Sequence, residues 1–511
     1  MRLVQALQRA ASVNADGLAT VDGDRRRTWA QVRDRVRRLA AGLVGLGVRP
    51  GDRVAILAHN CDFYFEAYFA VLWAGAVLTP LNTRLAPPEL AFQLQDSDAR
   101  VLIFGREFAE TAQVLKTDGR RLVGLDPDAA GAQVHAETLI AQNAPMEEVE
   151  RGNGDLAGIF YTGGTTGLPK GVMLSHLSLS AMASNLIMAC KVDEDCVNLH
   201  AAPMFHLADI GIVMVTMVAG THVFCRQLSE DVIVDLTARC GITHIFTVPA
   251  VIDRLAKHPR SAEALASLKV LGYGGSPMPM GTYEAARARF PDVDFIQGFG
   301  MTEMSAHTFL GPKHHRPGAD PRRLKSAGQV CYGYELKIVG EDGREAPRGE
   351  TGEIVGRGDN LMMGYWNRPE ETARALRDGW MHSGDVGFMD EAGFVYITDR
   401  LKDMIVSGAE NVYSIEVESV ISRHPAVDEC AVIGVPDETW GERVHAVVVP
   451  RAGAQLSLED LQAHVRAQIA GYKCPRSLEL HDGPLPRSAA GKILKTTLRE
   501  PYWAGRDRSV S

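Results

Sequence analysis

The sequence has no apolar run long enough to cross a membrane. The longest one spans residues 210 to 220, whereas a transmembrane helix needs about 20 apolar residues. The N-terminal segment MRLVQALQRAASVNADG lacks the apolar core of a secretory signal, and its pattern predicts an amphipathic helix. We therefore expect a cytoplasmic protein without a membrane span.

Patterns typical of metal sites are missing as well. None of the eight cysteines forms a CxxC pair or shows zinc-like spacing, and most have apolar neighbours. We expect them to be reduced thiols in a reducing compartment. His314 and His315 have no acidic or thiol partner at ligand spacing, so we interpret them as part of a loop.

The chain also lacks a surplus of positive charge. Its formal net charge is −9, which gives no electrostatic footprint for binding nucleic acid. No GxGxxG follows a predicted strand and no GxSxG is present, so the sequence supports neither a Rossmann dinucleotide site nor an α/β-hydrolase. Internal repeats and low-complexity segments are absent too.

What the chain does contain indicates a globular protein of several domains. Its 511 residues exceed what a single hydrophobic core holds, and the length suggests about three domains or subdomains. Thr28 and Gln31 form a capping box that predicts a helix ending at Gly47. Further along, the predicted elements are strands at 53–57 and 101–104 and a helix at 63–78.

This alternation of helices and strands continues to about residue 300 and predicts an α/β body of mostly parallel sheets covered by helices. Residues 351 to 365 are dense in glycine and predict a β-rich part with turns at Gly352, Gly356 and Gly358. The last hundred residues or so have the size of a separate domain. Their predicted elements are helices at 414–423 and 457–469 and strands at 430–434 and 444–449.

Residues 161 to 172, YTGGTTGLPKGV, are the most informative stretch. Four glycines and three threonines describe a loop whose backbone N–H groups and hydroxyls can close around phosphate oxygens, with Lys170 as a point charge. The string differs from a P-loop, because Pro169 and Gly171 occupy the positions of the required glycine and Ser/Thr. The stretch predicts a phosphate clamp of another kind.

Six further strings follow in order along the chain. They are PMFH (203–206), LGYGGS (271–276), QGFGMTE (297–303), WMHSGD (380–385), DRLKDMIVSGAEN (399–411) and PRSAAGKILK (486–495). With the loop at 161–172, they resemble the adenylate-forming superfamily of acyl-CoA synthetases, adenylation domains and firefly-type luciferases. Two positions depart from its pattern, with Phe299 in place of tyrosine and Ala409 in place of glycine.

The resemblance implies a large domain over residues 1–401, with a β-rich subdomain at about 310–400. A small, mobile C-terminal α+β domain would follow over residues 402–511, and Lys402 would be the hinge between the two domains. The hinge would let the small domain present different faces to one active site.

The resemblance also implies an ATP site. Phe299 would stack on adenine, Asp385 would accept hydrogen bonds from both ribose hydroxyls, and Arg400 would meet the ribose or a phosphate. The full expected set of nucleotide-binding residues is Thr162, Gly163, Gly164, Thr165, Thr166, Lys170, Gly274, Gly275, Ser276, Gln297, Gly298, Phe299, Gly300, Met301, Thr302, Asp385, Arg400 and Lys492.

Four of the residues are expected to take part in catalysis. Glu303 would hold Mg²⁺ against the phosphates, and Thr302 would contact the α-phosphate. Lys492 would bridge oxygens of the acid and of the phosphate, and His206 would border the acid-binding pocket. For coenzyme A, Gly408, Trp440 and Tyr472 would line the path of the thiol arm, and Arg84, Lys473 and Arg476 would meet the phosphates.

This set predicts an acid–thiol ligase that releases AMP. A carboxylate that attacks the α-phosphorus of ATP meets like charge, so cations and donors must neutralise the charge that develops. The products would be an acyl-adenylate and pyrophosphate, and coenzyme A would then displace AMP. Because Lys492 and the thiol would need the same space, a small domain that rotates is expected.

The acid is specified less well. The expected pocket segments are 206–213, 273–276, 298–299 and 304–307, with Asp209 as their one acidic side chain and no arginine for a dicarboxylic acid. Small residues there favour a medium- or long-chain fatty acid. The alternatives are a benzoate- or cinnamate-type acid, transfer to a carrier-protein thiol, and a silent nucleotide-binding protein, which Glu303 and Lys492 disfavour. The oligomeric state stays open, a homodimer included.

Overall fold

The computed structural model describes residues 1–117, 119–162, 169–275, 278–400, 403–407, 410–437, 440–469, 471–487 and 493–504. The chain forms two compact units. The large unit is Met1–Glu335 with Gly356–Met381, and the small unit is Leu336–Val355 with His382–Ser511. The predicted α/β class is confirmed. The predicted hinge at Lys402 and the predicted domain boundary beside it stay predictions, because residues 401 and 402 lie outside the described residues.

The first sheet of the large unit is mostly parallel, with an antiparallel edge. In spatial order its strands are β19 (Gly364–Tyr365), β9 (Lys170–Ser175), β8 (Leu156–Thr162), β4 (Val77–Pro80), β3 (Arg53–Leu57), β5 (Val101–Phe104), β6 (Arg121–Gly124) and β7 (Val134–His135). Parallel pairing runs from β8 to β7, whereas β8, β9 and β19 pair antiparallel.

The second sheet of the large unit has a parallel centre and antiparallel ends. Its order is β16 (Gly328–Val330), β15 (Ser305–Leu310), β14 (Asp294–Met301), β13 (Val270–Gly274), β12 (His244–Thr247), β10 (Val197–Leu199), β11 (Thr221–Phe224), β1 (Leu18–Asp22) and β2 (Arg25–Thr28). The strands from β14 to β1 are parallel. Their carboxyl ends therefore meet at one edge, where ligands bind in open α/β sheets.

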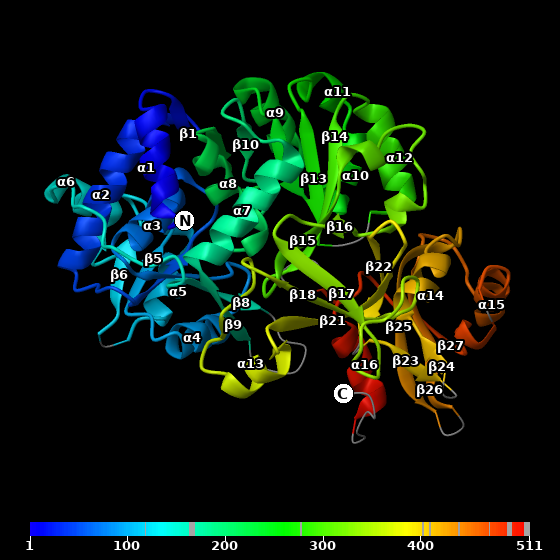
Figure 1. Ribbon diagram of the computed structural model, residues 1–511. Helices are drawn as coiled ribbons and strands as arrows, with labels where there is room; N and C mark the ends of the chain where they lie inside the picture. The colour runs from blue at the N-terminus through cyan, green and yellow to red at the C-terminus, as the bar shows by residue number, and fades with distance from the viewer. Residues whose placement is uncertain are drawn as a thin grey trace. The chain divides into compact units, whose positions relative to one another are not determined.

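Helices lie between the two sheets and on their outer faces. The helices of the large unit are α1 (Val4–Val13), α2 (Trp29–Gly45), α3 (Asp62–Trp73), α4 (Pro87–Asp96), α5 (Ala109–Val114), α6 (Ala136–Gln142), α7 (His176–Cys190), α8 (Gly211–Val218), α9 (Glu230–Cys240), α10 (Pro249–Lys257), α11 (Ser261–Ala264), α12 (Met280–Arg289) and α13 (Pro369–Ala375). Helix α7 contacts β9 in the first sheet and β15 in the second, and α3 contacts β4 and β1 (Figure 1). Both helices are therefore buried between the sheets.

The small unit contains most of a segment of four neighbouring strands and a separate sheet with helices. The first comprises β17 (Tyr334–Val339), β18 (Gly352–Gly358), β21 (Trp380–Met389) and β22 (Phe394–Arg400), of which β21 and β22 pair antiparallel. The separate sheet has the order β24 (Glu410–Val412), β23 (Ile405–Ser407), β26 (Gly441–Pro450), β25 (Val427–Asp437), and β27 (Ser477–Leu480) pairs with β26. The helices are α14 (Ser414–Ile421), α15 (Leu458–Arg466) and α16 (Lys495–Trp503).

Several predictions of local structure are confirmed and two are wrong. Helix α2 starts from the predicted capping box of Thr28 and Gln31. The helix predicted over 63–78 ends at Trp73, because Gly75 adopts a φ of 71° and the chain then enters β4. The glycine turns predicted in 351–365 are also wrong, since these glycines lie within β18. A Cβ at Gly356 would come within 2.4 Å of the Tyr334 hydroxyl, so close packing explains the glycine there.

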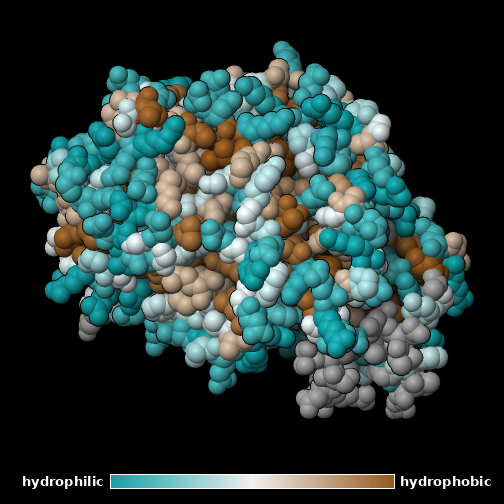
Figure 2. All heavy atoms as spheres, viewed as in Figure 1, coloured by the Kyte–Doolittle hydropathy of each residue, from teal (hydrophilic) through white to brown (hydrophobic). Residues whose placement is uncertain are grey.

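The face in Figure 2 is covered mainly by hydrophilic residues, and hydrophobic residues appear there in small, separate groups. Among the residues that the structure describes, no helix combines the length and the apolarity needed to span a membrane.

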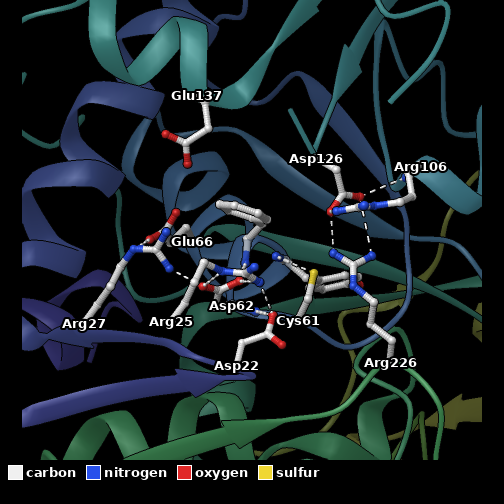
Figure 3. Close-up of polar contacts among 12 residues, drawn as sticks. Asp22, Arg25, Arg27, Cys61, Asp62, Glu66, Arg106, Asp126, Glu137 and Arg226 are labelled. Atoms are coloured by element: carbon white, nitrogen blue, oxygen red, sulfur yellow. Dashed lines mark hydrogen bonds and ion pairs between the residues drawn. The ribbon is translucent and has the colours of Figure 1, made fainter. Parts of the chain in front are cut away.

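A buried carboxylate joins the two sheets of the large unit. Asp62, at the start of α3, is 1% exposed and accepts hydrogen bonds from Arg25 Nε at 3.0 Å and from Arg27 (Figure 3). Both arginines belong to β2 of the second sheet, whereas Asp62 follows β3 of the first. Burial favours the neutral acid, but Arg25 and the other partners hold the pKa of Asp62 below its usual value.

Asp62→Ala should destabilise the protein by about 3 kcal/mol, because the arginines lose their buried partner. Urea denaturation measures this change. Glu147→Ala is the control, since Glu147 pairs with Arg37 but is 88% exposed, and its loss should cost less than about 1 kcal/mol. Equal losses in the two variants would contradict the structural role given to Asp62.

Candidate active site

Two of the predicted phosphate-binding residues face each other in a hairpin. Strands β8 and β9 pair antiparallel, and the register sets Thr162 opposite Lys170. Thr162 Oγ1 donates a hydrogen bond to the carbonyl oxygen of Lys170 at 3.5 Å. The connecting residues predicted for the same role are Gly163, Gly164, Thr165 and Thr166, which lie outside the described residues.

A second hairpin presents Thr302 and Glu303 in its turn. Its strands are β14 and β15, with Gly300 opposite Ala306. A Cβ at residue 300 would lie 2.0 Å from the carbonyl oxygen of Ser305, so only glycine permits this approach of the strands. The Glu303 side chain is buried, with 7% of the residue exposed.

One segment, residues 360–366, connects these two hairpins, and we call it the strap. At one end, the Met362 N–H donates to the carbonyl oxygen of Glu303 at 2.9 Å. At the other, the Trp366 N–H donates to the carbonyl oxygen of Gly171 at 2.7 Å, and β19 pairs with β9. The strap therefore fixes the turn of the second sheet against the hairpin of the first.

Tyr365 in the strap contacts both predicted functional groups. Its hydroxyl donates a hydrogen bond to Glu303 Oε1 at 3.0 Å. The ammonium of Lys170 lies 5.1 Å from the centre of its ring, which is cation–π distance. Burial and the neighbouring Glu303 carboxylate raise the pKa of Tyr365, so the hydroxyl keeps its proton and stays a donor.

Tyr365 is not among the site residues predicted from the sequence. It lies 62 residues from Glu303 along the chain and ends a segment whose glycines drew the interpretation toward turns. The sequence does show an aromatic residue directly after a glycine in that segment. Its contact with Glu303, however, is defined only by the tertiary fold.

The carboxyl ends of β13 and β14 meet where the base of ATP was expected. A Cβ at Gly274 would lie 2.6 Å from the carbonyl oxygen of Gly298 on the neighbouring strand, so the two backbones approach closely. Gly275 follows with a φ of 78°, which turns the chain away from the sheet. Ser276, predicted for the same site, lies outside the described residues.

The side chains of β14 at this edge have aromatic neighbours. The Phe299 ring meets the His307 ring edge to face, with 4.8 Å between their centres. One end of the Gln297 amide lies 3.4 Å from the Tyr273 hydroxyl on β13. Met301 ends the strand, directly before the turn with Thr302 and Glu303.

His206 lies where the predicted acid pocket begins, directly before the 3₁₀ turn Leu207–Asp209. The neighbouring Asp209 is engaged in the interior, because its Oδ2 lies 2.7 Å from His200 Nδ1. His200 Nε2 in turn lies 2.9 Å from His222 Nδ1. Asp209 therefore pairs with a buried histidine. This contact does not support the prediction that Asp209 is an acidic side chain lining the acid pocket.

A further buried histidine follows the Glu303 turn. His307 is 0% exposed, and its Nδ1 lies 3.2 Å from the carbonyl oxygen of Ser305, to which it must donate. Its Nε2 has no hydrogen-bond partner among the described residues. Burial lowers the pKa of His307 to about 4, so the ring is neutral and Nε2 is an acceptor.

The small unit carries the residues predicted for the ribose. Asp385 on β21 is buried, and the register sets it opposite Arg400 on β22. The Asp385 N–H donates to Ser383 Oγ at 3.0 Å. Three other predicted residues, Lys402, Gly408 and Lys492, lie outside the described residues.

Four of the residues predicted for coenzyme A belong to the small unit. The Arg476 guanidinium lies over the Trp440 ring, 4.3 Å from its centre. Lys473 beside Tyr472 donates to both oxygens of Glu416 at 2.7 Å. Burial works against the charge of Lys473, but the Glu416 carboxylate raises its pKa. Arg84, the fifth described residue of this set, belongs to the large unit and is exposed.

Comparison with known proteins decides the family. The model of the AMP-binding enzyme family matches residues 7–366, and that of the AMP-binding enzyme C-terminal domain matches residues 416–492. The chain belongs to the AMP-binding enzyme family. The predicted membership of the adenylate-forming superfamily is confirmed, and the chain is an AMP-forming acyl-CoA ligase with ATP and coenzyme A as substrates.

Relatives and solved structures match over nearly the whole chain. A feruloyl-CoA synthase from an Amycolatopsis species is 40% identical over 497 residues, covering 97% of this chain and 98% of that one. A long-chain-fatty-acid–CoA ligase from Mycobacterium tuberculosis is 36% identical over 483 residues, covering 94% of each. ATP-bound MatB from Rhodopseudomonas palustris superposes with a TM-score of 0.89 at 31% identity, covering 98% of this chain and 99% of that one.

Tyr365→Phe should lower the rate of pyrophosphate release by roughly 10- to 100-fold, because Glu303 loses a hydrogen bond to its charge. The ring stays beside Lys170, so the affinity for ATP should change less than the rate. Tyr396→Phe is the matched control, since the Tyr396 hydroxyl donates to another carboxylate, Asp390 Oδ2, at 3.4 Å. A normal rate in Tyr365→Phe, or an equal loss in Tyr396→Phe, would contradict the role of the strap.

Proposed function

We propose that the acid is aromatic and of the cinnamate type, in place of the fatty acid that the sequence alone favoured. The identity of 40% with a feruloyl-CoA synthase, over almost the full length of both chains, carries this proposal. The relative named for long-chain fatty acids is less similar, at 36%.

The orphaned acceptor on His307 supports the same choice. A buried acceptor without a partner costs free energy, of the order of 1–3 kcal/mol, unless a ligand supplies a donor. His307 lies against Phe299 and follows the Glu303 turn by four residues, within the predicted acid pocket. A phenolic hydroxyl at the far end of a hydroxycinnamic acid would supply that donor, whereas an alkyl chain would not.

The residues around Glu303 fit a magnesium ion. Mg²⁺ is usually held by one or two carboxylates together with the phosphates of the substrate. Glu303 provides a buried carboxylate, and Lys170, which contacts the same tyrosine, belongs to the hairpin proposed to hold the phosphates. Bound there with ATP, the ion would neutralise charge on the phosphates.

In the first half-reaction, an oxygen of the acid carboxylate attacks the α-phosphorus and pyrophosphate leaves. Lys170 and the Gly/Thr-rich loop hold the outer phosphates, and Thr302 donates to the α-phosphate. Lys492 contributes a cation shared between the acid and the phosphate. Tyr365 holds Glu303 in place, so that the carboxylate does not have to reorganise as the charge develops.

In the second half-reaction, the thiolate of coenzyme A attacks the acyl carbon and AMP leaves. Trp440 with the stacked Arg476, together with Tyr472, Lys473 and the exposed Arg84, receives coenzyme A. Since Lys492 and the thiol need the same space, a rotation about Lys402 exchanges them.

A panel of acids with ATP, MgCl₂ and coenzyme A tests the proposal, with CoA thioesters followed by mass spectrometry. We expect thioesters from ferulate and 4-coumarate at kcat/KM values at least tenfold above octanoate and palmitate. AMP and pyrophosphate should accompany them in equal amounts. Preference for a fatty acid would overturn the choice of acid, and transfer to a carrier protein without coenzyme A would overturn the choice of thiol.

His307→Leu tests the phenol contact. The wild type should prefer ferulate to its 4-O-methyl ether by roughly tenfold, and the variant should lose most of this preference. His307→Gln keeps an acceptor and should restore part of it. A preference that survives in His307→Leu would show that the phenol is bound elsewhere.

Lys492→Ala should separate the two halves of the reaction. Formation of acyl-adenylate should fall by at least roughly 100-fold, because the positioned cation is lost. Formation of the thioester from supplied acyl-adenylate and coenzyme A should stay near the wild-type rate. Equal loss of both steps would contradict the division of roles.

A further inference from the structure

A chain of three side chains leads from a buried histidine to the edge where the base is expected. Its members are His315, Tyr273 on β13 and Gln297 on β14, and the parallel register sets Gln297 beside Tyr273. The Tyr273 oxygen lies 2.9 Å from His315 Nε2 and 3.4 Å from the amide atom placed as Gln297 Oε1, whose assignment as oxygen or nitrogen depends on the hydrogen-bond network. The Gln297 side chain ends this chain of contacts, at the edge of the sheet.

The surroundings of His315 fix where its proton lies. His315 is 0% exposed, and its Nδ1 lies 3.0 Å from the carbonyl oxygen of Gly311. A carbonyl oxygen only accepts, so Nδ1 carries the proton. Burial lowers the pKa of His315 to about 4, so at neutral pH the ring has no second proton and Nε2 is an acceptor.

The protons then determine the orientation of the Gln297 amide. Tyr273 has one hydroxyl proton, and His315 Nε2 takes it. If Oε1 of Gln297 also faced Tyr273, two acceptors would compete for this single proton. With the amide turned over, its NH₂ group donates to the Tyr273 oxygen and every member is satisfied. Gln297 Oε1 then points away from Tyr273.

We propose that His315 is a positioning residue that acts through Tyr273 to hold Gln297 with its oxygen toward the nucleotide base. An amide oxygen there accepts a hydrogen bond from the exocyclic amine of adenine. It repels the carbonyl oxygen that hypoxanthine or guanine carries at the same position. The three residues would thus set the selectivity for ATP over nucleotides of hypoxanthine or guanine. This inference rests on the proposed nucleotide site.

A second contact to His315 supplies a matched control. The Tyr283 hydroxyl donates to the backbone carbonyl oxygen of His315 and not to its ring. Tyr283→Phe therefore removes a hydrogen bond from the same residue without changing the protons on Tyr273 or Gln297. Tyr273→Phe removes the hydroxyl that donates to His315 Nε2. His315→Leu removes this acceptor, so that the Tyr273 proton can be donated to Gln297 Oε1.

The test is the affinity of the full-length enzyme for ATP and for inosine triphosphate, measured by calorimetry without acid or coenzyme A. The wild type and Tyr283→Phe should bind ATP roughly tenfold or more tightly than inosine triphosphate. Tyr273→Phe leaves the amide free to turn, so the ratio should fall to within about threefold. His315→Leu should invert it, because the amide then presents its NH₂ group to the base.

Two outcomes would overturn the inference, and they differ in meaning. If Gln297→Leu abolishes the selectivity while Tyr273→Phe and His315→Leu keep it, the base contact stands and the role of His315 is wrong. If instead Gln297→Leu leaves the affinities for ATP and for inosine triphosphate both unchanged, the proposed nucleotide site at Gln297 is wrong. Thermal denaturation identifies variants that fail to fold, and Tyr273→Phe decides the question if His315→Leu is one of them.

Discussion

The contact of Tyr365 with both Glu303 and Lys170 is the constraint on which the site in the large unit depends. The carboxylate and the ammonium belong to hairpins of two different sheets, whose own hydrogen bonds do not set one against the other. The strap supplies that relation through backbone hydrogen bonds to both hairpins. Since phosphoryl chemistry depends on positioned charge, this geometry matters more than either motif alone.

How much of the site the sequence predicts follows from how local each feature is. The Gly/Thr-rich hairpin and the Glu303 turn are contiguous strings, and their order along the chain identifies the family without a structure. The hydrogen bond between Tyr365 and Glu303 joins residues far apart in sequence, and the same is true of the His315 contact with Tyr273. No periodicity or spacing encodes such pairs, so they become visible only when the sheets are assembled.

For the fold too, the elements determined by neighbouring residues were predicted correctly and those that depend on tertiary contacts were not. The capping box at Thr28 and the short strands at 53–57 and 101–104 are determined by neighbouring residues, and they appear where expected. The helix predicted over 63–78 failed because an all-apolar pattern does not distinguish a buried helix from a buried strand. The turns predicted at the glycines of β18 were wrong for a tertiary reason. The Tyr334 ring and the backbone of Val339 occupy the space that side chains at these positions would need.

Buried histidines form chains of hydrogen bonds beside the predicted site residues, and the positions of their protons can be worked out. Thr216 Oγ1 donates to the carbonyl oxygen of Ile212, so it must accept from His222 Nε2, and His222 Nδ1 must accept from His200. Burial lowers the pKa of His222 well below its usual value, which leaves that ring with one proton. His200 therefore donates at Nε2, and its Nδ1 lies 2.7 Å from Asp209 Oδ2. Each chain of contacts satisfies its members in one arrangement of the protons, and the two chains involve His200, ahead of the loop before His206, and Gln297 on β14.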